Sequence, residues 1–199
     1  MYPDAPMMPT RVIDALPYRL MHDYATIPVG AGALLVAAPS IVDPNFARTV
    51  VQVLHHDADD GTLGVIINRP RSTQEPALVG ALGEWLSDSA PPHRVFEGGP
   101  VSPDSFLCLT AAAGGVRSVD LTGESPETLS GPWRVFRGYS GWAPGQLDDE
   151  IGDAGWYVVA SEPHDIFDPE PLALWRTVLS RQSGILRRFA DFPEDPSVN

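Results

Sequence analysis

The chain has 199 residues and a formal net charge of −13, from 26 acidic and 13 basic side chains. This length predicts a single domain that can bury a core without help from a metal or a disulfide. The charge disfavours direct binding to DNA or to an anionic membrane, because both of those partners are negatively charged.

The N-terminal part predicts a flexible arm followed by β-strands. Residues 1–27 contain four prolines and scattered charges, so we expect a mobile arm there. Residues 33–37 are apolar and bounded by glycine and proline, which predicts a buried strand. Residues 48–55 and 63–67 are rich in β-branched side chains and flank an Asp/Gly turn, so they predict a β-hairpin.

Helical spacing appears in three later segments. Leu78, Leu82, Trp85 and Leu86 share one helical face, so we expect a helix over residues 74–87. A short helix is expected over residues 144–151. The last helix is expected to begin after Asp168, with Pro169 at its first position, and to end at Gly184. Its apolar face would carry Leu172, Trp175, Val178 and Leu179.

Further strands are expected at residues 94–97, 106–110, 133–137 and 156–160, joined by connections too short for helical crossovers. The predicted fold is therefore α+β, with a mixed and largely antiparallel sheet and about three helices packed on it. Residues 28–187 would form one domain, and residues 188–199 a flexible acidic tail. The N-terminus lacks a basic segment followed by an apolar one, which predicts a cytoplasmic protein.

Motifs for catalysis or metal binding are incomplete. Ser140 resembles the nucleophile of a hydrolase elbow, but Trp142 stands where that turn needs glycine. His55 and His56 are neighbours on a strand and would point to opposite faces. Cys108 lies in an apolar run and is expected to be a buried small hydrophobe. We therefore predict no catalytic residue, no metal and no cofactor, while a hydrolase using Ser140 or His55 stays open as an alternative.

A glycine- and aromatic-rich stretch, residues 138–147, precedes the short helix. Two interpretations stay open: a tight corner filled by Tyr139 and Trp142, or a site for a ligand or partner. Two arginines supply forked donors for a carboxylate or phosphate, although an internal ion pair such as Arg48 with Asp43 would also explain them. The predicted binding surface consists of Arg48, Asn68, Arg69, Tyr139, Ser140, Trp142 and Gln146. Its expected partner is a protein or a small anionic ligand.

Several of these stretches together resemble the YqgE/AlgH-type family of bacterial proteins. The matching pieces are residues 32–39, Asp43-Pro44 with Phe46 and Arg48, residues 61–70, residues 98–101 and residues 138–147. The resemblance spans about residues 28–182 and implies an α+β fold whose bent sheet forms a pseudo-barrel. Some members of this family are described as transcriptional regulators, and the resemblance supplies no catalytic residues.

The leading functional hypothesis is a non-enzymatic cytoplasmic binding or regulatory module, with an indirect role in transcription as one form of it. The hydrolase is the first alternative. A regulator that touches DNA itself is the second, and it is disfavoured by the net charge of −13 and by the absence of a helix-turn-helix pattern.

Overall fold

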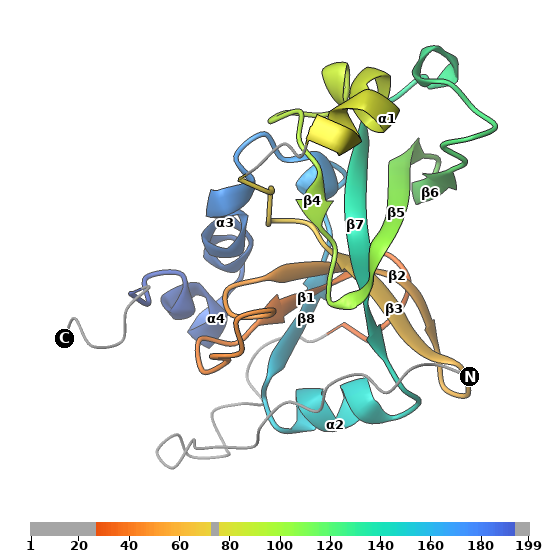
Figure 1. Ribbon diagram of the computed structural model, residues 1–199. Coiled ribbons are helices and arrows are strands. Elements are labelled where there is room, and N and C mark those ends of the chain that lie inside the picture. The colour runs from red at the N-terminus through yellow and green to blue at the C-terminus, as the bar shows by residue number, and fades with distance from the viewer. Residues whose placement is uncertain (1–26, 73–75, 194–199) are drawn as a thin grey trace.

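A strongly bent β-sheet forms the centre of the protein (Figure 1). The computed structural model describes residues 27–72 and 76–193. The strands are β1 Ala33–Ala37, β2 Val50–Asp57, β3 Gly61–Ile66, β4 Phe96–Glu97, β5 Val101–Ala112, β6 Gly115–Val119, β7 Trp133–Trp142 and β8 Trp156–Ala160. The α-helices are α1 Pro76–Ser87, α2 Gln146–Gly152, α3 Leu174–Ser180 and α4 Gly184–Phe189, and the 3-10 helices are η2 Pro126–Thr128, η3 Asp165–Phe167 and η4 Pro171–Ala173.

The strand order is β6-β5-β7-β3-β2-β1-β8, with β4 paired to β7. Every pairing is antiparallel except that of β4 with β7. The prediction of a mixed, largely antiparallel sheet in an α+β fold is thus confirmed. Among the described strands the sheet is open, because β6 and β8 end the order. Residues 27–72 and 76–193 contain four α-helices, where about three were expected.

Strand β7 joins the two halves of the sheet. Its first residues pair with β5, and its last residues, Ser140 to Trp142, pair with β3. Gly138 lies within the part paired with β5, where the register shifts between Arg137 and Tyr139, and has a φ of 66°. A Cβ at Gly138 would lie 2.5 Å from the Gly99 carbonyl oxygen, so the backbones cross here at a distance that only glycine allows.

The predicted hairpin is confirmed as β2 and β3, which pair from Val51↔Ile66 to Asp57↔Gly61 with an irregularity between Val53 and His55. Strand β1 is also confirmed. All five of its residues are buried because both of its faces are covered. Leu34 and Val36 pack on one face of the sheet, whereas Leu35 packs on the other.

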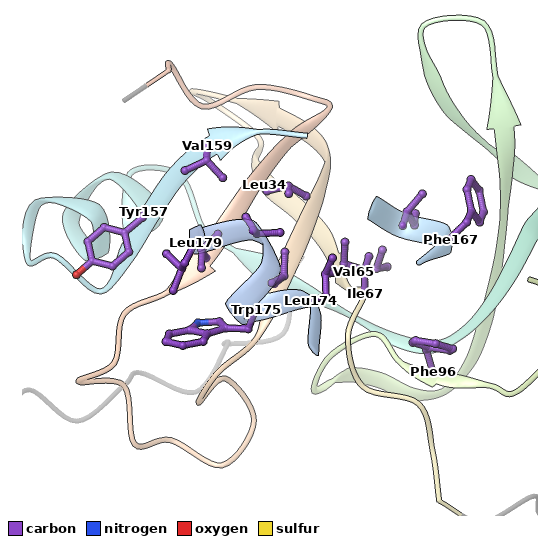
Figure 2. Close-up of a cluster of buried hydrophobic side chains, with 14 of the residues drawn as sticks. Leu34, Val65, Ile67, Phe96, Tyr157, Val159, Phe167, Leu174, Trp175 and Leu179 are labelled. Carbon is purple, nitrogen blue, oxygen red and sulfur yellow. The ribbon is translucent and has the colours of Figure 1, made fainter. Parts of the chain in front are cut away.

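The first of these faces carries the largest core cluster, to which α3 contributes. Figure 2 shows Leu174, Trp175 and Leu179 of α3 against Leu34 and Val159 of the sheet. The Trp175 indole N–H donates to the Ala37 carbonyl oxygen at 2.8 Å, which fixes the helix to β1. A separate cluster joins α1 to β5 and β7 and includes Trp85, Cys108 and Val135. No helix in the described ranges is long and apolar enough to cross a membrane.

The C-terminal region differs from the expected helix. Instead of one helix from Pro169 to Gly184, the chain forms η4, α3 and α4, and Gly184 begins α4. Leu172 is 81% exposed and does not belong to the apolar face, because it lies in η4 rather than in α3. The predicted boundary at residue 187 falls inside α4, and Ala190 beyond it is buried. The predicted N-terminal arm up to residue 26 and the last six residues lie outside the described ranges.

Candidate functional site

Two of the predicted binding residues, Asn68 and Arg69, stabilise the turn that leads into β2. The Asn68 side chain accepts a hydrogen bond from the Val50 N–H and donates one to the Arg48 carbonyl oxygen, both at 2.9 Å. Arg69 donates to the carbonyl oxygens of Pro44, Asn45 and Ala47. Burial lowers the pKa of Arg69, while the charge of Asp43 raises it. Through these contacts Asn68 and Arg69 hold the backbone of residues 44–50 in place, which is a structural role.

Arg48 holds the C-terminal segment rather than a ligand. Its guanidinium donates to the carbonyl oxygens of Phe192 and Pro193. It also lies over the Trp175 ring, 4.1 Å from the ring centroid, in a cation–π arrangement. An internal ion pair was the expected alternative for the two arginines, and the contacts described here are internal ones to carbonyl oxygens.

Trp142 and Gln146 belong to a packed cluster that we call the aromatic corner: Phe46, Trp142, Gln146, Glu150 and Trp156. Both indole N–H groups, of Trp142 and Trp156, donate to Oε2 of Glu150 at 3.0 and 2.8 Å. Gln146 donates to the other oxygen of the same carboxylate at 3.0 Å. The two indoles pack edge to face with centroids 5.7 Å apart. Trp142 is 5% exposed, so it offers almost no surface to a partner.

Ser140 and Tyr139 are neighbours on β7 and differ in burial, because their side chains point to opposite faces of the sheet. Ser140 is fully buried, and its hydroxyl donates to the Gly98 carbonyl oxygen at 3.1 Å. A nucleophilic serine needs a base at that distance, and here the described partner is a carbonyl that cannot accept a proton. Tyr139 is partly buried, and of the seven predicted residues it is the one that lines the cavity described next. A tight corner was one of the two interpretations of residues 138–147. In the structure, Gly138 to Trp142 form the second half of β7, and the chain turns afterwards, at residues 143–145, before α2 begins.

That cavity is a groove of about 870 Å³ between the β5–β6 hairpin and the β2–β3 hairpin. Leu107, Leu109 and Val116 line one wall, and Leu54 and Leu63 line the other. Loop residues 161–163 after β8, and Ile166 beyond them, close one side. Leu54, Leu107, Val116 and Tyr139 are partly buried and pack against the main core, so the groove is an unfilled extension of that core.

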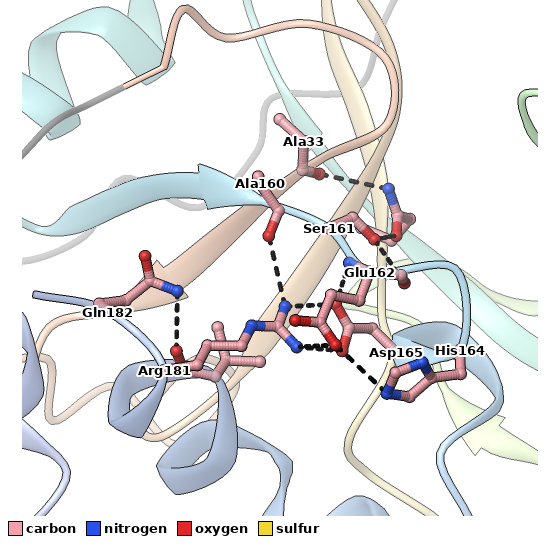
Figure 3. Close-up of polar contacts among 10 residues, drawn as sticks. Ala33, Ala160, Ser161, Glu162, His164, Asp165, Arg181 and Gln182 are labelled. Atoms are coloured by element: carbon pink, nitrogen blue, oxygen red, sulfur yellow. Dashed lines mark hydrogen bonds and ion pairs between the residues drawn. The ribbon is translucent and has the colours of Figure 1, made fainter.

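Polar groups occupy the rim at the β8 side of the groove. The Gln52 side chain donates to the Ala33 carbonyl oxygen and accepts from the Ser161 hydroxyl. Figure 3 shows the Arg181 guanidinium between the carbonyl of Ala160 and the carboxylates of Asp165 and Glu162. Arg181 donates to both oxygens of Asp165, at 2.7 and 2.5 Å, and this hydrogen bonding raises the pKa of Arg181.

Ligand atoms of Glu162, His164 and Asp165 lie within 4.8 Å of one another at this rim, close enough to share a metal ion. Both oxygens of Asp165 are engaged by Arg181, and one of them also accepts from the Glu162 N–H at 2.6 Å. A metal cation there would compete with a guanidinium that is already paired. The group is better described as an ion-pair network that anchors α3 to the loop after β8.

Two of the other chemically reactive candidates, His56 and Cys108, are also engaged in the fold. His56 Nδ1 lies 2.7 Å from the Thr62 hydroxyl, and His55 is exposed on the neighbouring position of β2. Cys108 is buried as expected, and this burial raises its pKa to about 12. Its thiol therefore stays protonated near neutral pH and is a poor nucleophile. The geometry offers a shaped apolar surface rather than a set of reacting groups.

Sequence reasoning missed nearly all of the groove. Its lining comes from many short segments between residues 31 and 166, and most of the lining residues are aliphatic residues, glycines or serines. The signal that could have indicated it is the Ala113–Gly114 turn, which returns the chain from β5 to β6 and so builds the outer wall. The sequence pattern predicts no strand at residues 115–119, where the structure forms β6.

The fold and the groove place the chain among α+β proteins with a bent, open sheet, and comparison with known proteins defines the group further. The AlgH-like family model matches residues 34–187. The chain belongs to the AlgH-like family, which confirms the resemblance noted in the sequence.

A UPF0301 protein of Streptomyces coelicolor is 45% identical over 189 residues, which covers 84% of this chain and 94% of the relative. A UPF0301 protein of Mycolicibacterium smegmatis is 37% identical and covers 86% and 92% of the two chains. The crystal structure of protein DIP2367 from Corynebacterium diphtheriae has a TM-score of 0.75 and 28% identity, over 87% of this chain and 98% of that one. The solution structure of AlgH from Pseudomonas aeruginosa has a TM-score of 0.53 and 25% identity, over 87% and 99%.

Proposed function

We propose that the chain is a non-enzymatic binding module of the cytoplasm and that its partner docks in the groove between the β5–β6 and β2–β3 hairpins. The observation that supports this most is the groove itself, an apolar hollow of about 870 Å³ that the core leaves unfilled. Cavities of roughly 300–1,000 Å³ with an apolar lining and a few polar groups at the rim are typical ligand sites.

The lining favours a protein segment over a small anion. Among the described lining residues, Glu162 is the one that carries a charge, and that charge is negative. A small anionic ligand would meet this carboxylate at the rim, and the neighbouring Arg181 is already paired with Asp165. A regulatory role in transcription would then act through a bound protein, because direct contact with DNA is opposed by the net charge of −13.

The hydrolase alternative finds less support. Ser140 is fully buried and donates to a carbonyl, and the reactive groups near the groove are held in the ion-pair network of Asp165 and Arg181. Binding by an apolar lining requires no proton transfer, so the groove alone is sufficient for the proposed role.

The test is a titration with Nile red, a neutral apolar dye, on the full chain and on two variants. Val116→Asn places an amide on the groove wall, whereas Val42→Asn makes the same change at a residue that is 79% exposed and outside the groove. We expect Val116→Asn to weaken dye binding by about tenfold, equivalent to about 1.4 kcal/mol. Val42→Asn should match the unmodified chain. Identical titrations for all three proteins would contradict the proposal.

A further inference from the structure

We infer that the partner of this groove is an extended peptide segment that adds a strand to the free edge of β6, with a basic side chain placed at Glu162. This inference rests on the proposed function, and it names the kind of partner and its mode of binding. In such strand addition, main-chain hydrogen bonds hold the peptide and pockets receive alternate side chains.

Strand β6 has the free edge that this mode requires. It ends the strand order and pairs with β5 alone among the described strands. In an antiparallel ladder, only every second residue exchanges hydrogen bonds with the neighbouring strand. The intervening residues of β6 therefore direct their N–H and C=O groups away from β5, where a further strand would pair.

The apolar groove lies on one face of this edge. Val116 and Ser118 of β6 line it, together with Leu107 and Leu109 of β5. A strand added beside β6 would place every second side chain on that same face, because side chains alternate along a strand. A groove next to a free edge thus matches a peptide with alternating apolar residues.

Exposed edges often carry a charged residue that blocks other strands, and Arg117 is that residue in β6. It lies between Val116 and Ser118, so its side chain leaves from the face opposite the groove. Its guanidinium donates to both carboxylate oxygens of Glu124, at 3.1 and 2.9 Å, and to the Ser118 carbonyl oxygen at 3.1 Å. Its charge is therefore neutralised within the chain, and an added strand has to replace the bond to the Ser118 carbonyl with a main-chain one.

Charge complementarity defines the rest of the partner. The Glu162 side chain is 50% exposed at the rim, and its Oε2 lies 3.4 Å from both the Arg181 and His164 nitrogens. These distances are longer than those of a hydrogen-bonded ion pair, so the carboxylate can accept from a further cation. The net charge of −13 also attracts basic segments and repels acidic ones.

The first experiment selects peptides from a random library displayed on phage, with the immobilised full chain as the target. We expect enriched peptides with apolar residues at alternate positions and an Arg or Lys at one end. Their binding should be lost in Val116→Asn and kept in Val42→Asn, the matched pair used with Nile red. Enrichment of acidic or helical peptides, or of none, would overturn the inference.

The second experiment separates strand addition from simple apolar contact. The best peptide is synthesised in two forms, with backbone N-methyl groups on either the odd or the even residues. One form should lose at least about tenfold in affinity and the other less than about twofold, because only one edge of the peptide donates to β6. Equal losses would show that main-chain pairing is not used.

The third experiment tests the basic residue with Glu162→Gln and with citrulline in place of the peptide's arginine, or acetyl-lysine in place of a lysine. Each change alone should weaken binding by about twofold to fivefold, as expected for an exposed ion pair, and both together should add little more. Fully additive losses would remove Glu162 from the site. If Nile red binds as proposed but no peptide is selected, this inference fails while the proposed function stands.

Discussion

The aromatic corner and the groove belong to different core clusters and differ in how completely they are filled. In the aromatic corner, Trp142 and Trp156 are buried and both of their N–H groups are bonded to Glu150. In the groove, Leu54, Leu107 and Val116 stay partly exposed around about 870 Å³ of open volume. The two indoles thus lie in the interior, whereas aliphatic side chains form much of the accessible lining of the groove.

This difference shows why a conspicuous sequence motif is a poor guide to a binding site in this protein. Indoles remove large apolar areas from water, so they contribute most where they are enclosed and hydrogen-bonded. A binding groove needs apolar side chains that remain exposed, and smaller side chains are exposed at a lower cost. The predictions below test whether the corner acts on stability and the groove on binding.

The largest expected effect is on stability in the aromatic corner. Trp142→Ala removes a buried indole and its hydrogen bond to Glu150, so we expect the free energy of unfolding to fall by about 3–5 kcal/mol. Guanidinium denaturation measures this loss. Nile red affinity of the folded variant should be unchanged, and a stable variant that has lost dye binding would place the site in the corner instead.

An intermediate effect is expected at Glu150, which joins the two indoles. Glu150→Ala leaves two N–H groups in the corner without their acceptor, and we expect a loss of about 2–3 kcal/mol in unfolding free energy. Glu150→Gln retains a side-chain oxygen and should lose about half as much. Equal losses in the two variants would mean that packing, not hydrogen bonding, sets the role of Glu150.

The smallest effect on stability is expected in the groove. Val116 is only partly buried, so Val116→Asn should change the unfolding free energy by less than about 1 kcal/mol, while it weakens Nile red binding as predicted above. Guanidinium denaturation of Val116→Asn beside Val42→Asn measures this. A large loss of stability at Val116 would show that the groove wall is part of the core, and the contrast between the two regions would fail.

Much of the fold was predictable from local pattern. The β2–β3 hairpin was visible because β-branched runs flank an Asp/Gly turn, and β1 because an apolar run lies between Gly32 and Pro39. Strand β6 was missed because Val116 and Val119 are separated by a charged and a polar residue, which weakens the strand pattern. The C-terminal helix was extended too far toward its start because Pro171 favours η4 there.

The candidate site was much less predictable, because it depends on contacts between distant segments. Gly138 and Gly141 suggested a turn, yet both lie within β7, where Gly138 permits the close crossing with Gly99. Asn68 and Arg69 resembled ligand contacts, yet they bond to the backbone around residues 44–50. A free edge such as that of β6 becomes visible only when the order of all strands is known.

Strand β7 gives this architecture a mechanical property. One continuous strand pairs with β5 and with β3 beside the groove and ends at Trp142 in the aromatic corner. A guest that moves the two hairpins apart would act on this strand, because both hairpins pair with it. We expect tryptophan emission to change when the groove is filled, and the same titration of Trp142→Phe would show how much of that change comes from the aromatic corner.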